Sequence, residues 1–218
     1  MAIREFPPVS EADSQGLLAL GGDLEVPSLV LAYKSGIFPW PFEAQILTWF
    51  APPRRAVLFL DQFHIPRSLK KSLSKSAWQI RFNTAFDEVI GSCAESKNRR
   101  GQAGTWITPD IVEAYKELHR AGYAHSIETW EGARLVGGLY GVAIGKMFAG
   151  ESMFYRKADA SKVAFVRLVE HLKAHGVEWL DCQVMTPHME ALGARTIRRD
   201  RFMQLLAEAV SARVKLFE

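Results

Sequence analysis

The chain has few of the residues that mark exported, membrane or metal-binding proteins. Its 218 residues include only two cysteines, Cys93 and Cys182, whose spacing supports neither a disulfide framework nor a metal site. No apolar run approaches the roughly 18 residues that cross a membrane. Residues 1–8 lack the long apolar core of a signal peptide. We therefore expect a cytoplasmic protein with reduced thiols and no membrane contact.

Signatures of cofactors and activated nucleophiles are missing as well. The sequence contains no GxGxxG, Walker loop, GxSxG or zinc motif. His171 and His175 lie one helical turn apart but lack a third ligand, so no metal is expected. The turn at 155–161, ahead of an expected long helix, has no glycine, and Asp159 would repel a pyrophosphate. We therefore expect neither coenzyme A nor any other cofactor.

Positive charge is concentrated, although the net charge is only +3. Residues 54–81 carry a net charge of +6, because Asp61 is the one acid among seven basic residues, which are Arg54, Arg55, Arg67, Lys70, Lys71, Lys75 and Arg81. Two smaller basic clusters are Lys97, Arg99, Arg100 and Arg195, Arg198, Arg199, Arg201. Such local excess suits a polyanion partner, whereas solvated helix faces are the alternative.

The pattern of punctuating residues divides the chain into two domains. Residues 1–60 are rich in proline, glycine and aromatics, which predicts a small N-terminal domain with one short helix near 28–34. In residues 61–218, segments with the apolar spacing of helices alternate with segments typical of strands. Strands are expected at 78–82, 125–130, 135–144, 147–155, 177–182 and 194–198, with helices at 66–76, 84–94, 108–121, 160–175, 187–192 and from 201. A strand is also expected at 55–60, and a polar loop at 97–104.

This order predicts an α+β fold with a mixed, mainly antiparallel sheet flanked by helices. It matches the GCN5-related N-acetyltransferase fold, whose substrate cleft opens where the fourth and fifth strands splay apart. Those strands would carry Glu151 and Asp181. Asp181 and Gln183 are two positions apart and should share a strand face, with Cys182 on the other. Because an unpaired buried carboxylate is costly, these residues indicate either a polar site or a structural ion pair.

Apolar and aromatic residues near this point allow two interpretations. Phe148, Met153, Leu168 and Leu172 could line a pocket or form an ordinary core. Trp40, Trp49 and Trp106 are more typical of a core than of a base-stacking platform, although Trp106 could serve both. The glycines of the 135–144 strand, Gly137, Gly138 and Gly141, could admit a ligand or serve hairpin geometry.

The motifs taken together resemble the leucyl/phenylalanyl-tRNA–protein transferase family over nearly the whole chain. The matching runs are Phe6-Pro7-Pro8, Gly16-Leu17-Leu18-Ala19, Gly21-Gly22-Asp23-Leu24, Tyr33, Gly36-Ile37-Phe38-Pro39-Trp40, Thr105-Trp106-Ile107, Ala114-Tyr115, Leu118-His119, Ala124-His125-Ser126, Glu128, Trp130, Leu135-Val136-Gly137-Gly138-Leu139-Tyr140-Gly141, Phe148-Ala149-Gly150-Glu151-Ser152-Met153-Phe154, Asp181-Cys182-Gln183 and Leu192-Gly193-Ala194. One departure lies at residues 49–54, Trp-Phe-Ala-Pro-Pro-Arg, where the family usually has Ser-Pro-Asp-Pro-Arg.

The resemblance implies transfer of leucine or phenylalanine, and also of methionine, from aminoacyl-tRNA to the α-amine of proteins beginning with Arg or Lys. This would mark the acceptor for N-degron proteolysis, in a monomeric enzyme without metal or coenzyme A. By resemblance, Asp181 and Gln183 hold and polarise the amine and Glu151 orders the donor or that network. The donor pocket and adenosine stack would comprise Trp49, Trp106, Tyr115, Phe148, Met153, Leu168 and Leu172. The tRNA would lie on Arg67, Lys70, Lys71 and Lys75.

Three other functions remain open from the residues alone. An N-acetyltransferase with an unusual coenzyme A loop would release thiol from acetyl-CoA. A non-catalytic RNA-binding protein would bind charged and uncharged tRNA alike. A peptidoglycan-bridge aminoacyltransferase would normally need a longer chain with two copies of the fold.

Overall fold

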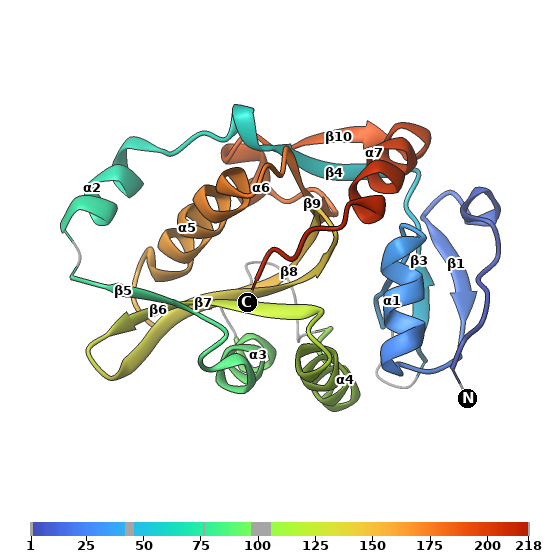
Figure 1. Ribbon diagram of the computed structural model, residues 1–218, viewed down its shortest axis with the longest axis horizontal. Helices are drawn as coiled ribbons and strands as arrows, with labels where there is room; N and C mark the ends of the chain where they lie inside the picture. The colour runs from blue at the N-terminus through green and yellow to red at the C-terminus, as the bar shows by residue number, and fades with distance from the viewer. Residues whose placement is uncertain (1, 42–45, 76, 97–105, 218) are drawn as a thin grey trace.

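The computed structural model describes residues 2–41, 46–75, 77–96 and 106–217. The expected loop at 97–104 and the basic cluster Lys97, Arg99, Arg100 lie outside these residues. A small three-stranded sheet has the order β1-β3-β2, from Leu17–Leu20, Thr48–Phe50 and Phe38–Pro39. The larger sheet has the order β10-β4-β9-β8-β7-β6-β5 (Figure 1). Its strands are Arg195–Arg198, Arg54–Phe59, Trp179–Gln183, Met147–Tyr155, Arg134–Ile144, Ala124–Glu131 and Gln79–Phe82.

Neighbouring described strands of the larger sheet run antiparallel except β8 and β9, which are parallel. This confirms the predicted α+β class with a mixed, mainly antiparallel sheet. The α-helices are α1 Val26–Lys34, α2 Arg67–Lys75, α3 Phe86–Glu95, α4 Pro109–Arg120, α5 Ala160–Ala174, α6 Pro187–Ala191 and α7 Arg199–Ser211, with short 3-10 turns at Val9–Glu11 and Leu60–Gln62. In the part of the chain that is described, no helix has both the length and the apolar character needed to cross a bilayer.

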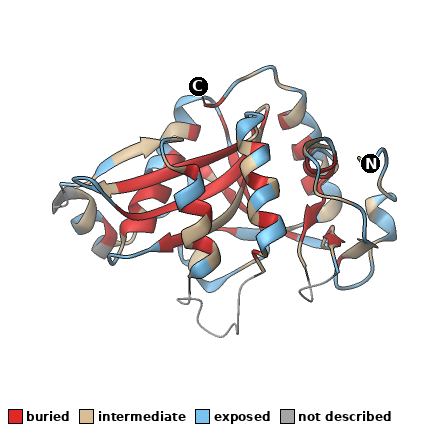
Figure 2. Ribbon diagram, turned by 90° about the horizontal axis from the view of Figure 1, so that it is seen from below, coloured by how far each residue is buried: buried red, intermediate tan, exposed pale blue. Residues whose placement is uncertain are grey.

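The sheet separates two apolar cores. Helix α5 covers one face and α3 and α4 the other, with α1 beside α4 (Figure 1). The core on the α5 side contains Phe148, Leu168 and Leu172. The core on the opposite side contains Tyr33 and Tyr115 and extends to the small sheet. Figure 2 shows the buried residues running along the central strands and the helix faces turned toward them.

Strand β4 pairs with β9 and β10, so it belongs to the larger sheet although all of it precedes residue 60. We propose that any division into domains falls before Arg54. Thr84 does not cap α3, whose first flanking residue is Ala85. Instead, the N–H and hydroxyl of Thr84 both donate to the buried carboxylate of Glu128 on β6, and hydrogen bonds to an ionised acceptor are the stronger ones.

The cap of α4 follows the sequence pattern. Thr108 accepts a hydrogen bond from the backbone N–H of Ile111, and Pro109 occupies the first helical position, as expected. The last helix begins at Arg199 rather than Arg201.

Glycines in β7 allow close packing. A Cβ at Gly137 would lie 2.6 Å from the Cβ of Ala160, so the absence of a side chain lets the first turn of α5 rest on the sheet. At Gly141 a Cβ would lie 2.3 Å from the carbonyl oxygen of Ala149 and 2.5 Å from the Phe148 ring. These two glycines therefore admit protein atoms, and Gly141 determines where the Phe148 ring lies.

We expect Gly141→Ala to lower the free energy of unfolding by about 1–3 kcal/mol, the usual cost of overpacking a core. Gly91→Ala is the matched control, because Gly91 lies within α3 and its Cβ would meet nothing within 4 Å. That variant should be stabilised by about 0.5–1 kcal/mol, since alanine favours the helix. Urea denaturation of both variants measures the difference. Equal stabilities would show that the strand relaxes around the added methyl group.

Candidate active site

The parallel pairing between β8 and β9 is short, and we call the place where it ends the β8–β9 opening. The strands pair through Ala149 and Asp181. On the other side of β8, Gly141 pairs with Gly150 and Tyr140 with Ser152, which leaves Glu151 as the extra residue of a β-bulge. Gln183, the last residue of β9, has a φ of 58°, in the left-handed region. Bulges re-aim side chains, and both irregularities direct polar groups toward the opening.

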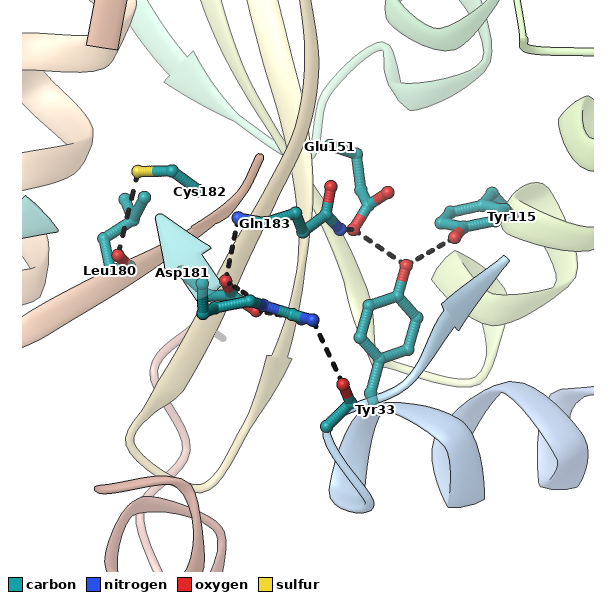
Figure 3. A network of polar contacts seen from close by, with 9 residues as sticks. Tyr33, Tyr115, Glu151, Leu180, Asp181, Cys182 and Gln183 are labelled. Atoms are coloured by element: carbon teal, nitrogen blue, oxygen red, sulfur yellow. Dashed lines mark hydrogen bonds and ion pairs between the residues drawn. The ribbon is translucent and has the colours of Figure 1, made fainter. Parts of the chain in front are cut away.

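One oxygen of Glu151 collects hydrogen bonds from two directions (Figure 3). The side-chain amide of Gln183 donates to Glu151 Oε1 at 2.7 Å. The hydroxyl of Tyr33, on α1, donates to the same oxygen at 2.7 Å. The hydroxyl of Tyr115, on α4, is hydrogen-bonded to that of Tyr33. A continuous hydrogen-bonded network therefore joins α4 and α1 to the middle of β8 and the end of β9.

Asp181 is held by a buried arginine. Arg55 on β4 donates from Nε to Oδ1 at 2.8 Å and from Nη2 to Oδ2 at 2.6 Å. Both side chains are only 2% exposed. The third nitrogen, Nη1, donates to the carbonyl oxygen of Gly36 at 3.1 Å. Bidentate, charge-assisted pairing of this kind satisfies a carboxylate that would otherwise be costly to bury.

Aromatic rings and one backbone group complete the surroundings of this pair. The guanidinium carbon of Arg55 lies 4.6 Å from the ring centre of Phe38 and 4.5 Å from that of Phe202, on α7. Asp181 Oδ1 also accepts from the backbone N–H of Gln183 at 2.9 Å. Asp181 thus fixes the backbone of Gln183, whose side chain in turn reaches Glu151.

Burial shifts the pKa values of the titratable side chains in this hydrogen-bonded network. Burial raises the pKa of Glu151 to about 7, with a further contribution from the charge of Asp181, whereas Tyr33, Gln183 and Arg55 act to lower it. Burial and then the charge of Glu151 raise the pKa of Tyr33 and of Tyr115 well above the ordinary value. The tyrosines therefore remain neutral donors near pH 7, and Glu151 is poised between its two forms.

The predicted polar residues come together, whereas the predicted pocket residues divide between the two cores. Asp181, Gln183 and Glu151 form the network above, and Cys182 contacts the opposite core, as the strand alternation predicts. The residues on the α3–α4 side are Trp49, Trp106 and Tyr115. Those on the α5 side are Phe148, Met153, Leu168 and Leu172. The sheet separates the two groups, and the β8–β9 opening lies between them.

The predicted tRNA-binding residues lie on α2. Arg67, Lys70 and Lys71 are exposed, and Lys75 is the last residue of the helix. Ser72 of this helix donates to Asp159 Oδ2 at 2.8 Å, which ties α2 to the start of α5. The exposed basic face is therefore attached to the larger sheet through α5.

Sequence reasoning missed Arg55 and Tyr33 as members of the site. Arg55 was counted among the basic residues of a surface stretch, but it is buried. The available signal was its position inside an otherwise apolar strand, where a charge needs a partner such as Asp181. Tyr33 has no comparable signal, because a tyrosine on an amphipathic helix is usually packed without a specific polar role.

The fold and the site define an α+β protein with a buried carboxylate–amide network at the opening of a sheet. Its donors and acceptors come from β4, β8, β9 and α1, and they are hydrogen-bonded to one another.

Comparison with known proteins identifies the family. The family profile "Leucyl/phenylalanyl-tRNA protein transferase" matches residues 57–207, and the profile of its N-terminal domain matches residues 22–53. A leucyl/phenylalanyl-tRNA–protein transferase of Chromobacterium violaceum is 53% identical over 207 residues, covering 94% of this chain and 88% of its own. The corresponding protein of Flavobacterium johnsoniae is 51% identical over 201 residues, covering 92% and 94%. The chain belongs to the leucyl/phenylalanyl-tRNA–protein transferase family, and the resemblance found in the sequence is confirmed.

Solved structures show more distant similarity. FemX aligns with a TM-score of 0.47 at 10% identity, covering 83% of this chain and 71% of its own. L-PGS of Bacillus licheniformis aligns with a TM-score of 0.46 at 12% identity, covering 87% and 71%.

We expect Arg55→Met to lower the free energy of unfolding by about 3–5 kcal/mol, because it leaves Asp181 buried without its partner. Arg54→Met is the control: Arg54 is exposed, and its side chain lies 3.4 Å from the hydroxyl of Thr196, so a change within about 0.5 kcal/mol is expected. The double variant Arg55→Met with Asp181→Leu should recover part of the loss. Urea denaturation of all three tests this, and an Arg55 variant no less stable than the Arg54 control would contradict the role assigned to the pair.

Proposed function

We propose that the protein transfers leucine or phenylalanine, and also methionine, from aminoacyl-tRNA to the N-terminal α-amine of proteins that begin with Arg or Lys. This transfer would mark the acceptors for N-degron proteolysis in the cytoplasm, and we propose that the enzyme acts as a monomer. The names of its relatives support the donor and the reaction. The observation that carries the proposal is the Glu151–Gln183–Asp181–Arg55 network at the β8–β9 opening.

The reaction requires little covalent chemistry from the protein. The ester of aminoacyl-tRNA is already activated, so the amine nitrogen can attack the carbonyl carbon directly. The carbon–oxygen bond of the ester then breaks, and the ribose hydroxyl of the tRNA leaves with a proton. The protein has to orient the amine, accept its proton and stabilise the oxyanion.

We assign these tasks from the geometry. The amide nitrogen of Gln183 is committed to Glu151, so its amide oxygen is the atom that would accept a hydrogen bond from the attacking amine. Glu151, whose pKa is about 7, would take the proton. Asp181 is fully engaged by Arg55 and by the backbone of Gln183, and it would therefore position Gln183 rather than act as the base.

The donor would cross the opening between the strands. Its ester would lie beside Gln183, and its side chain would enter the α5-side core at Phe148, Met153, Leu168 and Leu172. A pocket without room for branching at Cβ would accept leucine, phenylalanine and methionine and refuse valine and isoleucine. Trp106 is half-buried and would stack on the terminal adenosine. Trp49 is 1% exposed and packs edge-on against Phe6, so it would support that region from beneath.

The function is tested by mixing labelled leucyl-tRNA with peptides that begin with Arg, Lys or Ala. Label should pass to the Arg and Lys peptides and not to the Ala peptide. Equal binding of charged and uncharged tRNA without transfer would identify an RNA-binding protein instead. Thiol release from acetyl-CoA in the presence of an amine would identify an acetyltransferase.

The pH dependence of transfer separates the role of Glu151 from that of the acceptor. Since burial raises the pKa of Glu151 to about 7, the carboxylate is protonated below that value and the base form is gained as the pH rises. The acceptor amine, with an ordinary pKa of about 7.7–8.0, must also lose a proton. With saturating donor, the slope of log rate against pH should approach two below about pH 6 in the parent protein, from two ionisations, and one in Glu151→Gln.

The same pair of variants tests the hydrogen bonds of Glu151. Glu151→Gln keeps a side-chain oxygen for Tyr33 and Gln183, so at pH 8 it should retain more activity than Glu151→Ala. Removing a general acid or base typically lowers the reaction rate on the order of 10²–10⁴-fold. An unchanged slope in Glu151→Gln would remove Glu151 as the base.

We expect Lys70→Ala combined with Lys71→Ala to raise the KM for charged tRNA and to flatten the log–log salt dependence of binding. Each phosphate contact contributes a slope of about −0.7 to −0.9, so the change should be about one to two units. Leucyl-adenosine serves as the control donor, because it has no acceptor-arm phosphates and should be used at the parental rate. Equal loss with both donors would move the tRNA surface elsewhere, for example to Arg195–Arg201.

A further inference from the structure

The segment that follows α7 lies against the proposed donor pocket. It leaves the helix and reaches the larger sheet on the side of α5 (Figure 1). Leu216 and Phe217 are only 3% and 4% exposed and belong to the same buried core as Phe148, Leu168 and Leu172. The proposed function gives this segment no role.

Histidines from two elements hold the segment in place. Nε2 of His171, on α5, donates to the carbonyl oxygen of Leu216 at 2.7 Å. The Phe217 ring is stacked on His125 of β6, with centroids 4.3 Å apart and an interplanar angle of 18°. It is also stacked on His171, at 4.8 Å and 24°. A backbone hydrogen bond and two ring contacts thus give Phe217 a defined position rather than a loose apolar one.

Phe148 is confined between β7 and Phe217. Its ring occupies the space of the missing Gly141 side chain, so the backbone of β7 blocks movement in that direction. The Phe217 ring lies 5.8 Å away at an angle of 49°. Phe148 itself is fully buried, as are Leu168 and Leu172. A donor side chain can therefore enter this core only if a neighbouring side chain moves. The position of Phe217 limits how far Phe148 can move.

We propose that Phe217 is a specificity-determining residue that sets the depth of the donor pocket by limiting the position of Phe148. The inference rests on the proposed function, because it assumes that Phe148 contacts the side chain of the transferred amino acid. His171 has a positioning role, since it fixes the backbone of the segment through Leu216. Shortening Phe217 would deepen the pocket, so larger donors would gain relative to leucine.

The test compares kcat/KM for leucyl-, phenylalanyl- and tryptophanyl-adenosine with an Arg-initiated peptide. Phe217→Ala should raise the phenylalanine-to-leucine ratio roughly 10-fold, the lower end of the discrimination available to an apolar pocket, and the tryptophan-to-leucine ratio further. His171→Ala should shift the ratios in the same direction by less. Its effect should largely disappear when it is combined with Phe217→Ala, because both act through one contact.

Phe63→Ala is the matched control. Phe63 packs against the same core and lies 5.8 Å from Phe165, but it contacts α5 rather than the segment. Its donor ratios should stay parental. If Phe217→Ala changes the ratios no more than Phe63→Ala, the inference is overturned. If Phe217→Ala does not fold, Phe217→Leu replaces it, with a ratio change of at least about 3-fold supporting the inference and parental ratios overturning it.

Binding separates this inference from the proposed function. Calorimetry with non-hydrolysable leucyl- and phenylalanyl-adenosine amides reports donor preference without transfer. A parent protein that binds both amides but transfers nothing refutes the proposed reaction, while the Kd ratio in Phe217→Ala still decides the role of Phe217. A parent protein that binds neither amide refutes both.

Discussion

The buried ion pair of Arg55 and Asp181 is the interaction on which the rest of the site depends. It joins β4 to β9 inside the sheet, and through Gly36, Phe38 and Phe202 it also joins the N-terminal region and α7 to the same point. Because neither charge could be buried alone, these elements have to assemble together. The orientation of Gln183 follows from the pair, since Asp181 holds its backbone.

The parallel strands β8 and β9 turn this anchor into a site. Here the bulge at Glu151 and the left-handed turn at Gln183 end the pairing soon after Ala149 and Asp181. The polar network then lies on the α3–α4 side of the sheet, and the core that contains Phe148 lies on the α5 side. A donor with a polar ester and an apolar side chain needs both environments within a few ångströms.

Electrostatic interactions dominate on one side of this opening and steric packing on the other. The ion pair is closed to solvent and keeps a constant geometry, whereas Glu151 is half-buried and can change its charge near pH 7. The tyrosines supply hydrogen bonds to Glu151 without competing for its proton, because burial keeps them neutral. On the α5 side the constraints are steric, since Gly141 and Phe217 together confine Phe148.

Local patterns alone determined much of this protein: the strand alternation that places Asp181 and Gln183 opposite Cys182, the capped start of α4 at Thr108, the order of helices and strands along residues 61–218 and the family itself. These features depend on neighbours in sequence or on motifs spread along the chain. Only the tertiary structure decided that Arg55 is buried, that Thr84 bonds to Glu128 instead of capping α3, and that the aromatic and apolar residues of the predicted pocket lie in two cores. The polar partners are distant in sequence: Glu128 is 44 positions from Thr84, and Asp181 is 126 positions from Arg55. A charge in a strand shows that a partner is needed, but it does not show which residue supplies it, because pairing across a sheet is set by the register of the whole fold.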